Sequence, residues 1–401
     1  MTDSASYDPL ASVQAAGPPG TISFIYGLPD PASFPVEDLR RAAGEVLRQR
    51  PELALQYGPE QGYGPLIDFV RARLARKEGL AVERPQIMLS GGSAQALDHI
   101  CTLLTRPGDI VLVEAPTYHE TLQLFRDHGL RPLQVDTDDG GLQLDALAGR
   151  LAELARRGER ARLLYVIPNF QNPSGITLAA NRRQPLWELA ERYDLLVVED
   201  DVYRDLAYQG QVPPSLYAWD QRRPEGSGPG RTLRIGSFSK ILAPALRLGW
   251  LLGPPGVIER LVGSGLRAMS GGVNPLVSNI LAEYCSQGLL EPHIEGLRAL
   301  YSERRDAMLD SLALHMPPGT SWTRPGGGFF VWLGLPLPLR AAEVAGRARD
   351  ARLLIPVGDP FFAEEPAGQY LRLAFSYVTP AKIRDGIAIL GQVLGEMMAD
   401  N

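Results

Sequence analysis

Lysine is scarce in this chain of 401 residues, whereas arginine is abundant. Only Lys77, Lys240 and Lys382 are lysines, and the other 37 of the 40 basic residues are arginines. An arginine stays protonated in a protein and cannot act as an amine nucleophile, which a lysine can do. Chemistry that needs a side-chain amine must therefore depend on one of three positions.

Other absences exclude whole classes of protein. No apolar run approaches the ~20 residues that cross a bilayer, and the first residues lack the basic and apolar regions of a signal peptide. Cys101 and Cys285 lie in apolar helical patterns without metal or redox spacing, which favours buried thiols in a reducing compartment. The net charge of −6 indicates neither a nucleic-acid nor a membrane partner. We therefore expect a cytoplasmic protein without a metal site.

The composition is that of a soluble globular protein, with 45% apolar and 21% charged residues, and the length allows two domains. From about residue 62 onward, helical patterns alternate with short runs that are apolar throughout. Such runs indicate strands buried on both faces, and hence an α/β fold with a mostly parallel sheet between helices. The predicted strands are 86–89, 110–114, 162–167, 195–200, 233–236 and 248–252.

Changes in composition also divide the chain. Residues 1–35 are rich in proline, glycine and serine, which predicts an irregular N-terminal arm. A helix is expected at 36–50, and a late strand at 329–333. We predict a large domain over 36–285 and a smaller α+β domain over 286–401, which part of the N-terminal segment joins.

Lys240 stands out among the lysines because of its neighbours. It ends the motif Ser237-Phe238-Ser239-Lys240, and Arg247 follows seven positions later. Hydroxyls and an arginine suit a phosphate, and a lysine amine can condense with an aldehyde. The pattern therefore points to a Schiff base with pyridoxal 5′-phosphate (PLP). The alternative is that Lys240 is an ordinary loop lysine. The hypothesis therefore depends on whether the chain has residues that could bind the other parts of this cofactor.

Candidates for the cofactor's phosphate and ring face follow two of the strands, where open α/β sheets place their ligands. Ser93 and Ala94 come after Gly91-Gly92 and open a helix, whose free N–H groups bind phosphate well. A simple N-cap at Ser93 is the alternative. Tyr118 comes shortly after the strand at 110–114 and could either lie flat on the pyridine ring or pack on its neighbours.

Two further strand ends carry polar candidates. Asn172 could donate a hydrogen bond to the phenolic oxygen, with a cis bond to Pro173 fixing its aim, or could belong to an ordinary turn. Asp200 would keep the pyridine nitrogen protonated, and Tyr203 would share the phenolic oxygen. Because buried carboxylates are costly, we expect a cation nearby. The alternative, a helix N-cap, applies best to Asp201.

Arg372 is a lone arginine within the apolar run 370–376. A buried arginine needs an anion. The α-carboxylate of an amino acid would satisfy it with two parallel hydrogen bonds, and an internal salt bridge is the alternative.

Taken in order, these motifs resemble the fold-type I PLP-dependent enzymes of aminotransferase class I/II. The details are similar to the subgroup of 2-aminoadipate and kynurenine aminotransferases and the aminotransferase-like half of MocR regulators. The resemblance runs from Gly27 to Arg372 and implies a seven-stranded, mostly parallel sheet in the large domain. The motifs that carry it are Leu55-Gln56-Tyr57-Gly58, Asn172-Pro173-Ser174-Gly175, Glu199-Asp200-Asp201-Val202-Tyr203 and Ser237-Phe238-Ser239-Lys240.

The resemblance also implies a role for each candidate in catalysis. Lys240 would bind the cofactor aldehyde and carry the proton from the substrate Cα, and Asp200 would pair with the pyridine nitrogen. Asn172 and Tyr203 would hold the phenolic oxygen, and Tyr118 would stack on the ring.

Binding roles follow from the same resemblance. Arg372 would take the substrate α-carboxylate, with Asn172 and the backbone near Gly27 contributing to the substrate site. Tyr57 would reach the phosphate of a neighbouring subunit, which implies a homodimer with shared active sites. The residues expected at the phosphate are Ser93, Ala94, Ser237, Ser239 and Arg247.

The chain departs from its relatives at two points. Ala94 stands where many of them carry glutamine, although its backbone amide could still bind phosphate. No arginine precedes Arg40, whereas relatives that use acidic side chains often contribute one from the arm. This absence argues against an adipate-like or glutamate-like substrate, although other arginines could substitute. Phe24, Tyr26 and Leu28 would suit aromatic or branched side chains better.

The expected function is that of an aminotransferase with a ping-pong mechanism, acting on an L-amino acid with an aromatic, branched or 2-aminoadipate-like side chain and on a 2-oxo acid. One alternative is a β-eliminating lyase of the same fold. The other is a non-enzymatic sensor like the MocR regulators, but about 20 residues precede Thr21, too few for their DNA-binding domain.

Overall fold

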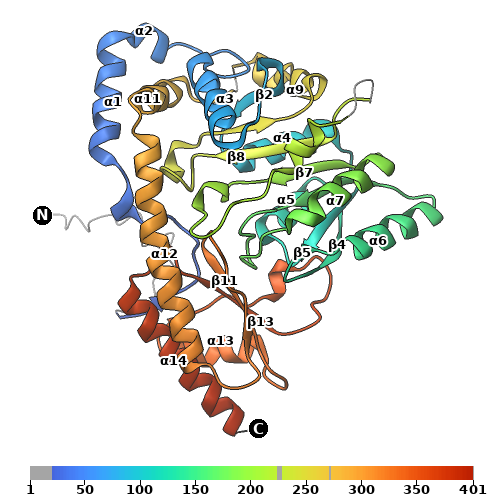
Figure 1. Cartoon of the computed structure of the whole chain (residues 1–401), viewed down its shortest axis with the longest axis vertical. Coiled ribbons are helices and arrows are strands. Elements are labelled where there is room, and N and C mark those ends of the chain that lie inside the picture. The colour runs from blue at the N-terminus through green and yellow to red at the C-terminus, as the bar shows by residue number, and fades with distance from the viewer. Residues whose placement is uncertain (1–19, 224–227, 271, 401) are drawn as a thin grey trace, which may run out of the picture.

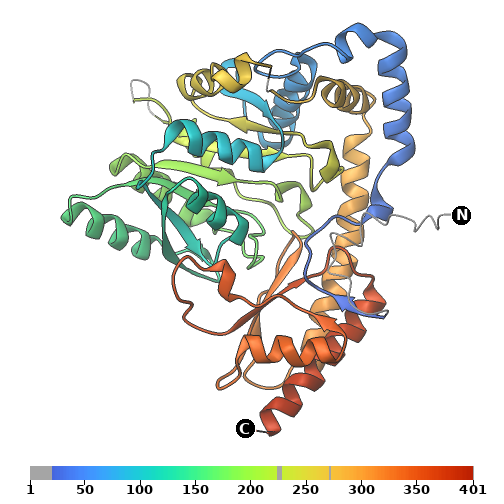
Figure 2. The ribbon, with the colours of Figure 1, turned by 180° about the vertical axis from the view of Figure 1, so that it is seen from behind.

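The computed structural model of this chain describes residues 20–223, 228–270 and 272–400. Most of the predicted N-terminal arm lies outside the described residues. Figures 1 and 2 show a large sheet wrapped by helices in the upper part of the molecule and a smaller sheet below it. The long helix α12 (Leu290–His315) runs alongside both. No helix in the described ranges is long and apolar enough to span a membrane.

The large sheet has the strand order β2-β9-β8-β7-β6-β3-β4-β5. Neighbouring strands from β8 through β4 are parallel, whereas β9 is antiparallel to both of its neighbours and β5 is antiparallel to β4. The α/β class and the mostly parallel sheet are therefore confirmed. The strands are β2 (Ile87–Ser90), β3 (Ile110–Ala115), β4 (Arg131–Asp138), β5 (Gly141–Leu142), β6 (Ala161–Val166), β7 (Leu196–Asp200), β8 (Thr232–Ser237) and β9 (Gly249–Leu252).

Each of the six predicted strands is present within one residue of its expected ends. The expected number of seven strands is wrong, because the described sheet also includes the two-residue strand β5. The pattern analysis also missed β4, which lies near the edge of the sheet. Only Val135 of its eight residues is buried, so this strand has no continuous apolar run.

Helices cover both faces of this sheet, which explains the uninterrupted apolar runs. Val111 and Val113 of β3 point to the face covered by α4 and α5, whereas Ile110 and Leu112 point to α6 and α7. The helices are α1 (Val36–Gln49), α2 (Pro51–Ala54), α3 (Gly64–Glu78), α4 (Ser93–Leu104), α5 (His119–Asp127), α6 (Leu144–Arg156), α7 (Ala180–Arg192), α8 (Leu216–Asp220), α9 (Pro255–Val262), α10 (Gly265–Ala268), α11 (Pro275–Ser286), α12, α13 (Ala341–Asp350) and α14 (Pro380–Ala399).

The smaller sheet is antiparallel, with the order β10-β11-β13, and packs against helices of the C-terminal part. The late strand expected at 329–333 is present as β11 (Phe330–Gly334). It lies between β10 (Ser321–Trp322) and β13 (Tyr370–Ala374). The segment after residue 20 joins this part, because β1 (Ile22–Ser23) pairs in parallel with β12 (Leu353–Leu354). The domain boundaries at residues 35/36 and 285/286 stay a prediction.

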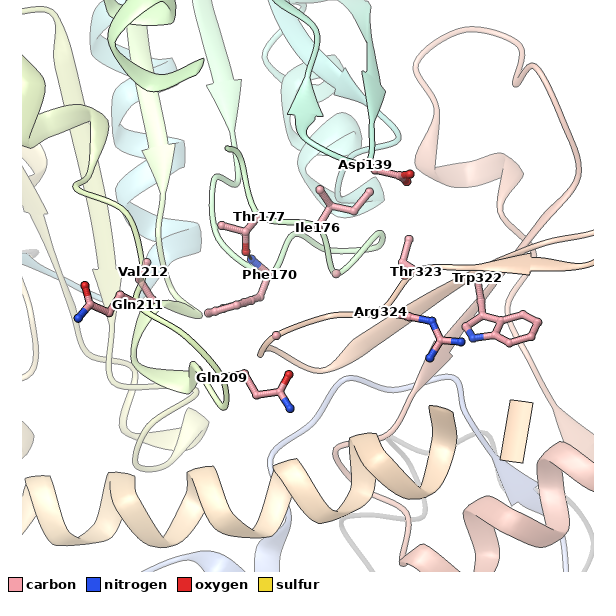
Figure 3. A pocket seen from close by; sticks show the side chains of 12 residues that line it. Asp139, Phe170, Ile176, Thr177, Gln209, Gln211, Val212, Trp322, Thr323 and Arg324 are labelled. Carbon is pink, nitrogen blue, oxygen red and sulfur yellow. Dashed lines mark hydrogen bonds between the residues drawn. The ribbon is translucent and has the colours of Figure 1, made fainter. Parts of the chain in front are cut away.

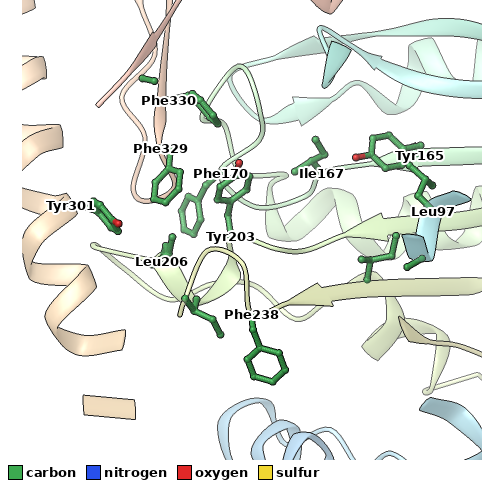
Figure 4. Packing of buried hydrophobic residues seen from close by; sticks show 14 of the residues in the cluster. Leu97, Tyr165, Ile167, Phe170, Tyr203, Leu206, Phe238, Tyr301, Phe329 and Phe330 are labelled. Atoms are coloured by element: carbon green, nitrogen blue, oxygen red, sulfur yellow. The ribbon is translucent and has the colours of Figure 1, made fainter. Parts of the chain in front are cut away.

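Aromatic side chains connect the two sheets. The ring of Tyr203, just after β7, meets Phe329 edge to face at 5.5 Å, and Phe329 meets Tyr301 of α12 at 4.9 Å. Figure 4 shows these rings together with Phe330. Edge-to-face pairs of this kind add to the burial of apolar surface. They hold the end of β7 at a set position relative to β11, and two of these rings, Tyr203 and Phe330, line the cavity described next.

Candidate active site

A cavity of about 900 Å³ opens at the carboxyl ends of the parallel strands, between the two sheets and the segment Ile25–Leu28. This is where open α/β sheets bind their ligands. The two predicted site residues that do not line it are Ser237 and Tyr57. The other eleven, which do, are Gly27, Ser93, Ala94, Tyr118, Asn172, Asp200, Tyr203, Ser239, Lys240, Arg247 and Arg372.

Lys240 lies in the turn after β8 and is the one lysine of the three that faces this cavity. Its Nζ donates a hydrogen bond to the carbonyl oxygen of Gly27 at 3.3 Å. Burial lowers the pKa of Lys240 to about 8, although the nearby Asp200 carboxylate opposes this shift. An amine with a pKa near neutrality can be both a nucleophile and a proton carrier. Lys77, by contrast, pairs with Glu291 at 2.9 Å on the surface.

Asp200, the last residue of β7, is buried and lines the cavity. Its Oδ2 accepts a hydrogen bond of 2.7 Å from the Tyr165 hydroxyl. Its Oδ1 is buried and accepts no hydrogen bond of normal geometry from any described residue. Burial raises the pKa of Asp200 to about 6, although the hydrogen bond from Tyr165 by itself lowers this pKa. A buried acceptor without a partner fits a ligand N–H, such as a protonated ring nitrogen.

The carboxylates on either side of Asp200 have structural partners. Glu199 accepts hydrogen bonds of 3.0 Å from two backbone amides at the start of α8. Asp201 accepts a bond from Arg234, whose Nη2 lies 3.0 Å from its Oδ2. The expected cation is therefore Arg234, and the alternative of a helix N-cap for Asp201 is wrong. Alternation along an extended chain directs Asp200 alone into the cavity.

The start of α4 forms a cradle that fits a phosphate. The N-cap is Gly92, at φ 87°, so the alternative of an N-cap at Ser93 is wrong. This positive φ favours glycine, because a side chain at position 92 would be strained there. The first amides of α4, with Ser93 and Ala94, face Arg247 across the cavity wall.

The two serines before Lys240 have different positions. Ser239 lines the cavity, whereas Ser237 lies behind it and does not. The Ser237 hydroxyl donates to Oγ of Ser239 at 3.0 Å and accepts a bond from the Ser239 amide, also at 3.0 Å. The structure therefore places Ser237 as a support for Ser239 and not in the cavity wall.

Arg372 lies in β13 at the opposite side of the cavity and is buried. Its Nη1 donates to Oδ1 of Asn172 at 3.1 Å, and its guanidinium stacks on the rings of Phe330 and Phe361 at 4.6 and 4.9 Å. In the described ranges no carboxylate forms an ion pair with it, so the alternative of an internal salt bridge is wrong. Burial without a counterion lowers its pKa to about 10, which leaves an anion site open to the cavity.

Asn172 and the aromatic residues complete the walls. The Asn172–Pro173 peptide bond is cis, as expected. The amide oxygen of Asn172 accepts the bond from Arg372, and this leaves its NH₂ group to donate toward the cavity. Tyr118, the N-cap of α5, donates its hydroxyl to the carboxylate of Glu120.

Sequence reasoning missed several residues that shape the site. Tyr165 is one residue of the apolar run of β6, and its hydrogen bond to Asp200 depends on the register of β6 and β7. Glu114 is buried and accepts a bond from the amide of Ile167, and Gln171 donates to it at 3.3 Å. A glutamate at the end of an otherwise apolar strand was the available signal for Glu114.

Tyr57 lies away from this cavity, with 80% of its surface exposed. A second, smaller cavity of about 500 Å³ backs onto the loop that carries Asn172 (Figure 3). Phe170, Thr177 and Arg324 are among its lining residues, and it includes none of the predicted site residues. The chemistry-bearing side chains therefore converge on the larger cavity.

Comparisons with known proteins identify the family of this chain. Residues 27–390 match the family model for aminotransferase class I and II. The chain is 38% identical to aromatic-amino-acid aminotransferase 1 of Thermococcus litoralis, over 94% of this chain and 88% of that protein. It is 37% identical to 2-aminoadipate transaminase of Thermus thermophilus, over 95% and 92% of the two chains.

Solved structures agree with the sequence matches. A Pyrococcus horikoshii kynurenine aminotransferase, solved with PMP, kynurenine and its product, has a TM-score of 0.90 and 36% identity over 99% of this chain and 96% of that one. The expected fold type I is thus confirmed along with the resemblance. The chain belongs to the aminotransferase class I and II family.

Proposed function

We propose that this aminotransferase moves an amino group between an L-amino acid and a 2-oxo acid by a ping-pong mechanism, and that its preferred amino acids have aromatic or branched side chains. Its cofactor is PLP. The observation that carries the proposal is one cavity lined by three groups: a buried amine of lowered pKa, Lys240, a carboxylate oxygen of Asp200 without a partner, and the Arg372 guanidinium, which has no counterion in the described residues.

Each residue has a defined task in the proposed reaction. When bound, the cofactor supplies an electron-withdrawing ring that stabilises charge at the substrate Cα. Oδ1 of Asp200, which has no partner in the described residues, would accept a hydrogen bond from the ring nitrogen and so keep that nitrogen protonated. Arg372 binds the α-carboxylate and orients the Cα–H bond toward Lys240. Nζ of Lys240 then takes the proton from Cα, as its lowered pKa allows.

The phosphate end anchors the cofactor. The first amides of α4, the hydroxyls of Ser93 and Ser239, and the guanidinium of Arg247 offer donors around one point of the cavity wall. Tyr118 and Tyr203 complete the ring site. We assign these roles by the fit of the side chains to the cofactor.

The cavity lining favours apolar substrate side chains. Tyr26, Leu28, Phe330 and Phe361 line it, and the described arm has no arginine. Phe24, which we expected to contribute, is instead fully buried in the core. The relatives named for aromatic amino acids and for kynurenine support the same choice.

A panel of amino acids tests the function. With PLP-loaded enzyme and no acceptor, aromatic and branched amino acids should convert the cofactor to its amine form and release the matching 2-oxo acid in a single turnover. Absorbance spectra and 2-oxo acid analysis measure this half-reaction. Continuous release of pyruvate from cysteine or cystathionine without an acceptor would instead indicate the β-eliminating lyase.

We also propose a two-fold dimer with shared active sites. Large apolar side chains are exposed around Tyr57, including Leu55 at 66% and Met269 at 85%. These segments are neighbours, because Nη1 of Arg267 donates to the carbonyl oxygen of Glu60 at 2.6 Å. An apolar patch of this kind indicates an interface. Analytical ultracentrifugation should find a dimer at micromolar concentration, and a monomer would contradict this proposal.

A further inference from the structure

Tyr165 is a fully buried tyrosine that has none of the tasks above, although its hydroxyl bonds to the carboxylate assigned to the ring nitrogen. It lies in β6, where it pairs with Val198 of the neighbouring strand β7. Asp200 is two residues further along β7 and therefore on the same face of the sheet. The Tyr165 hydroxyl spans this step and donates to Oδ2 of Asp200 at 2.7 Å. The register of the two strands thus brings the phenol to the carboxylate.

A buried tyrosine has an ordinary reason to donate a hydrogen bond, because its hydroxyl would otherwise lie unpaired in the core. That need does not require an ionisable partner. The hydroxyl of the buried Tyr284 donates to the backbone carbonyl of Leu289 at 3.3 Å, and that of Tyr217 has no partner in the described residues. Tyr165 differs from them because its partner is a carboxylate that lines the active-site cavity.

Two contacts from α5 fix the Tyr165 side chain. Phe125 meets its ring edge to face at 5.7 Å. The hydroxyl of Thr121, which is buried at the edge of the cavity, donates to the Tyr165 hydroxyl at 3.4 Å. Because Tyr165 accepts this bond, its own hydroxyl proton is left for Asp200. The packing of α5 on the sheet therefore sets the direction of the bond to the carboxylate.

The groups around Asp200 decide whether its carboxylate is ionised. Burial raises the pKa of Asp200, and the charge of Asp201 raises it further. Tyr165, Lys240 and the backbone amide of Val202 lower this pKa, and the hydrogen bond from Tyr165 is the largest of these three contributions. Lys240 changes its charge during the proposed reaction, whereas burial raises the pKa of Tyr165 and keeps its hydroxyl neutral. Tyr165 is therefore a constant donor to the carboxylate.

We propose that Tyr165 is a positioning residue that keeps the Asp200 carboxylate ionised and leaves Oδ1 as the oxygen that faces the ring nitrogen of the cofactor. The bond from Tyr165 occupies Oδ2, and Oδ1 is buried without a partner in the described residues, so Oδ1 is available to a ligand. Without the bond, the shared proton would move from the ring nitrogen toward the carboxylate, and the ring would withdraw electrons less strongly. This inference rests on the role given to Asp200 in the proposed function.

Tyr165→Phe tests the inference, because it removes the hydroxyl and keeps the ring against Phe125. In the cofactor-free enzyme, the pKa of Asp200 should rise by about one unit, since a hydrogen bond to the charged form is lost. In the PLP-loaded enzyme, kcat should fall on the order of tenfold, whereas KM should stay within about twofold because Arg372 is unchanged. NMR titration of isotope-labelled aspartate and steady-state kinetics with phenylalanine measure these effects.

Tyr217→Phe is the matched control. It removes an equally buried hydroxyl that has no partner in the described residues, and it should leave the pKa of Asp200 and kcat unchanged. A second comparison uses the Asp200→Asn enzyme as the background. There Tyr165→Phe should lower kcat less than about twofold, because no carboxylate is left for the hydroxyl to stabilise.

An unchanged pKa of Asp200 in Tyr165→Phe would overturn the inference. An equal loss of kcat in the wild-type and Asp200→Asn backgrounds would do the same, because it would show that Tyr165 acts only on the packing of the sheet. If the wild-type enzyme releases no 2-oxo acid from any amino acid, the proposed function itself fails. That outcome is distinguishable, because the NMR titration needs neither cofactor nor substrate.

Discussion

Lys240→Ala is expected to lower turnover by at least about 10⁴-fold, because no other amine faces the cavity. Lys77 and Lys382 lie on exposed helix positions, so neither can replace it. Borohydride should attach the cofactor covalently to the wild-type enzyme at Lys240 and should fail to do so in the variant. Turnover assays and peptide mass spectrometry measure both effects.

The two remaining lysines provide matched controls. Lys77→Ala and Lys382→Ala remove the same group and should retain wild-type turnover. If mass spectrometry found the reduced cofactor on either of them, the assignment of Lys240 would be wrong.

The same variant should not lose stability in its cofactor-free form. The pKa of Lys240 is about 8 in the folded protein and near its ordinary value of 10.5 in the unfolded chain. The folded state therefore binds fewer protons between these values, and the ammonium destabilises it fully below pH 8. This penalty disappears as the pH rises to about 10.5. At pH 7 we expect the alanine variant to unfold at a temperature no lower than the wild type.

Arg372→Ala should weaken the reaction of every amino acid by a similar factor. The guanidinium is buried and has no counterion, so a bound carboxylate gains a charge-assisted bidentate contact of about 3 kcal/mol, or on the order of a hundredfold in kcat/KM. Because all amino acids share the α-carboxylate, the loss should be independent of the side chain. Kinetics with phenylalanine, leucine and alanine measure it.

Two further results bear on this prediction. The affinity for PLP should stay within about threefold of the wild type, because the phosphate cradle is at the other end of the cavity. Arg324→Ala removes a guanidinium that lines the smaller cavity and should leave all three substrates unaffected. A selective loss of one amino acid in Arg372→Ala would contradict its role at the common carboxylate.

Local sequence patterns predicted much of the fold and of the candidate site. Uninterrupted apolar runs located six strands, because strands buried on both faces need apolar residues at every position. Polar residues directly after such runs identified Asp200 and Asn172. β4 was missed because its exposed position near the sheet edge removes that constraint.

The sequence does not reveal which way a side chain points or at which residue a helix begins. Ser237 and Ser239 are the same residue type in one motif, yet only Ser239 lines the cavity. Ser93 is a good N-cap residue, but the helix begins one residue earlier than that role requires, and Gly92 with its positive φ is the N-cap. Phe24 is apolar like Leu28, yet it points into the core.

The amino-acid sequence by itself was enough to predict the family, the cofactor and Lys240 as the candidate for the reactive amine. They depend on side chains whose chemistry no other residue type supplies, and on apolar runs and motifs that are local in the chain. Only the tertiary structure decided which oxygen of Asp200 is left without a partner, and that Tyr165 and Arg234 support this end of the sheet. Such relations join residues far apart in sequence, and strand register and side-chain packing bring them within bonding distance.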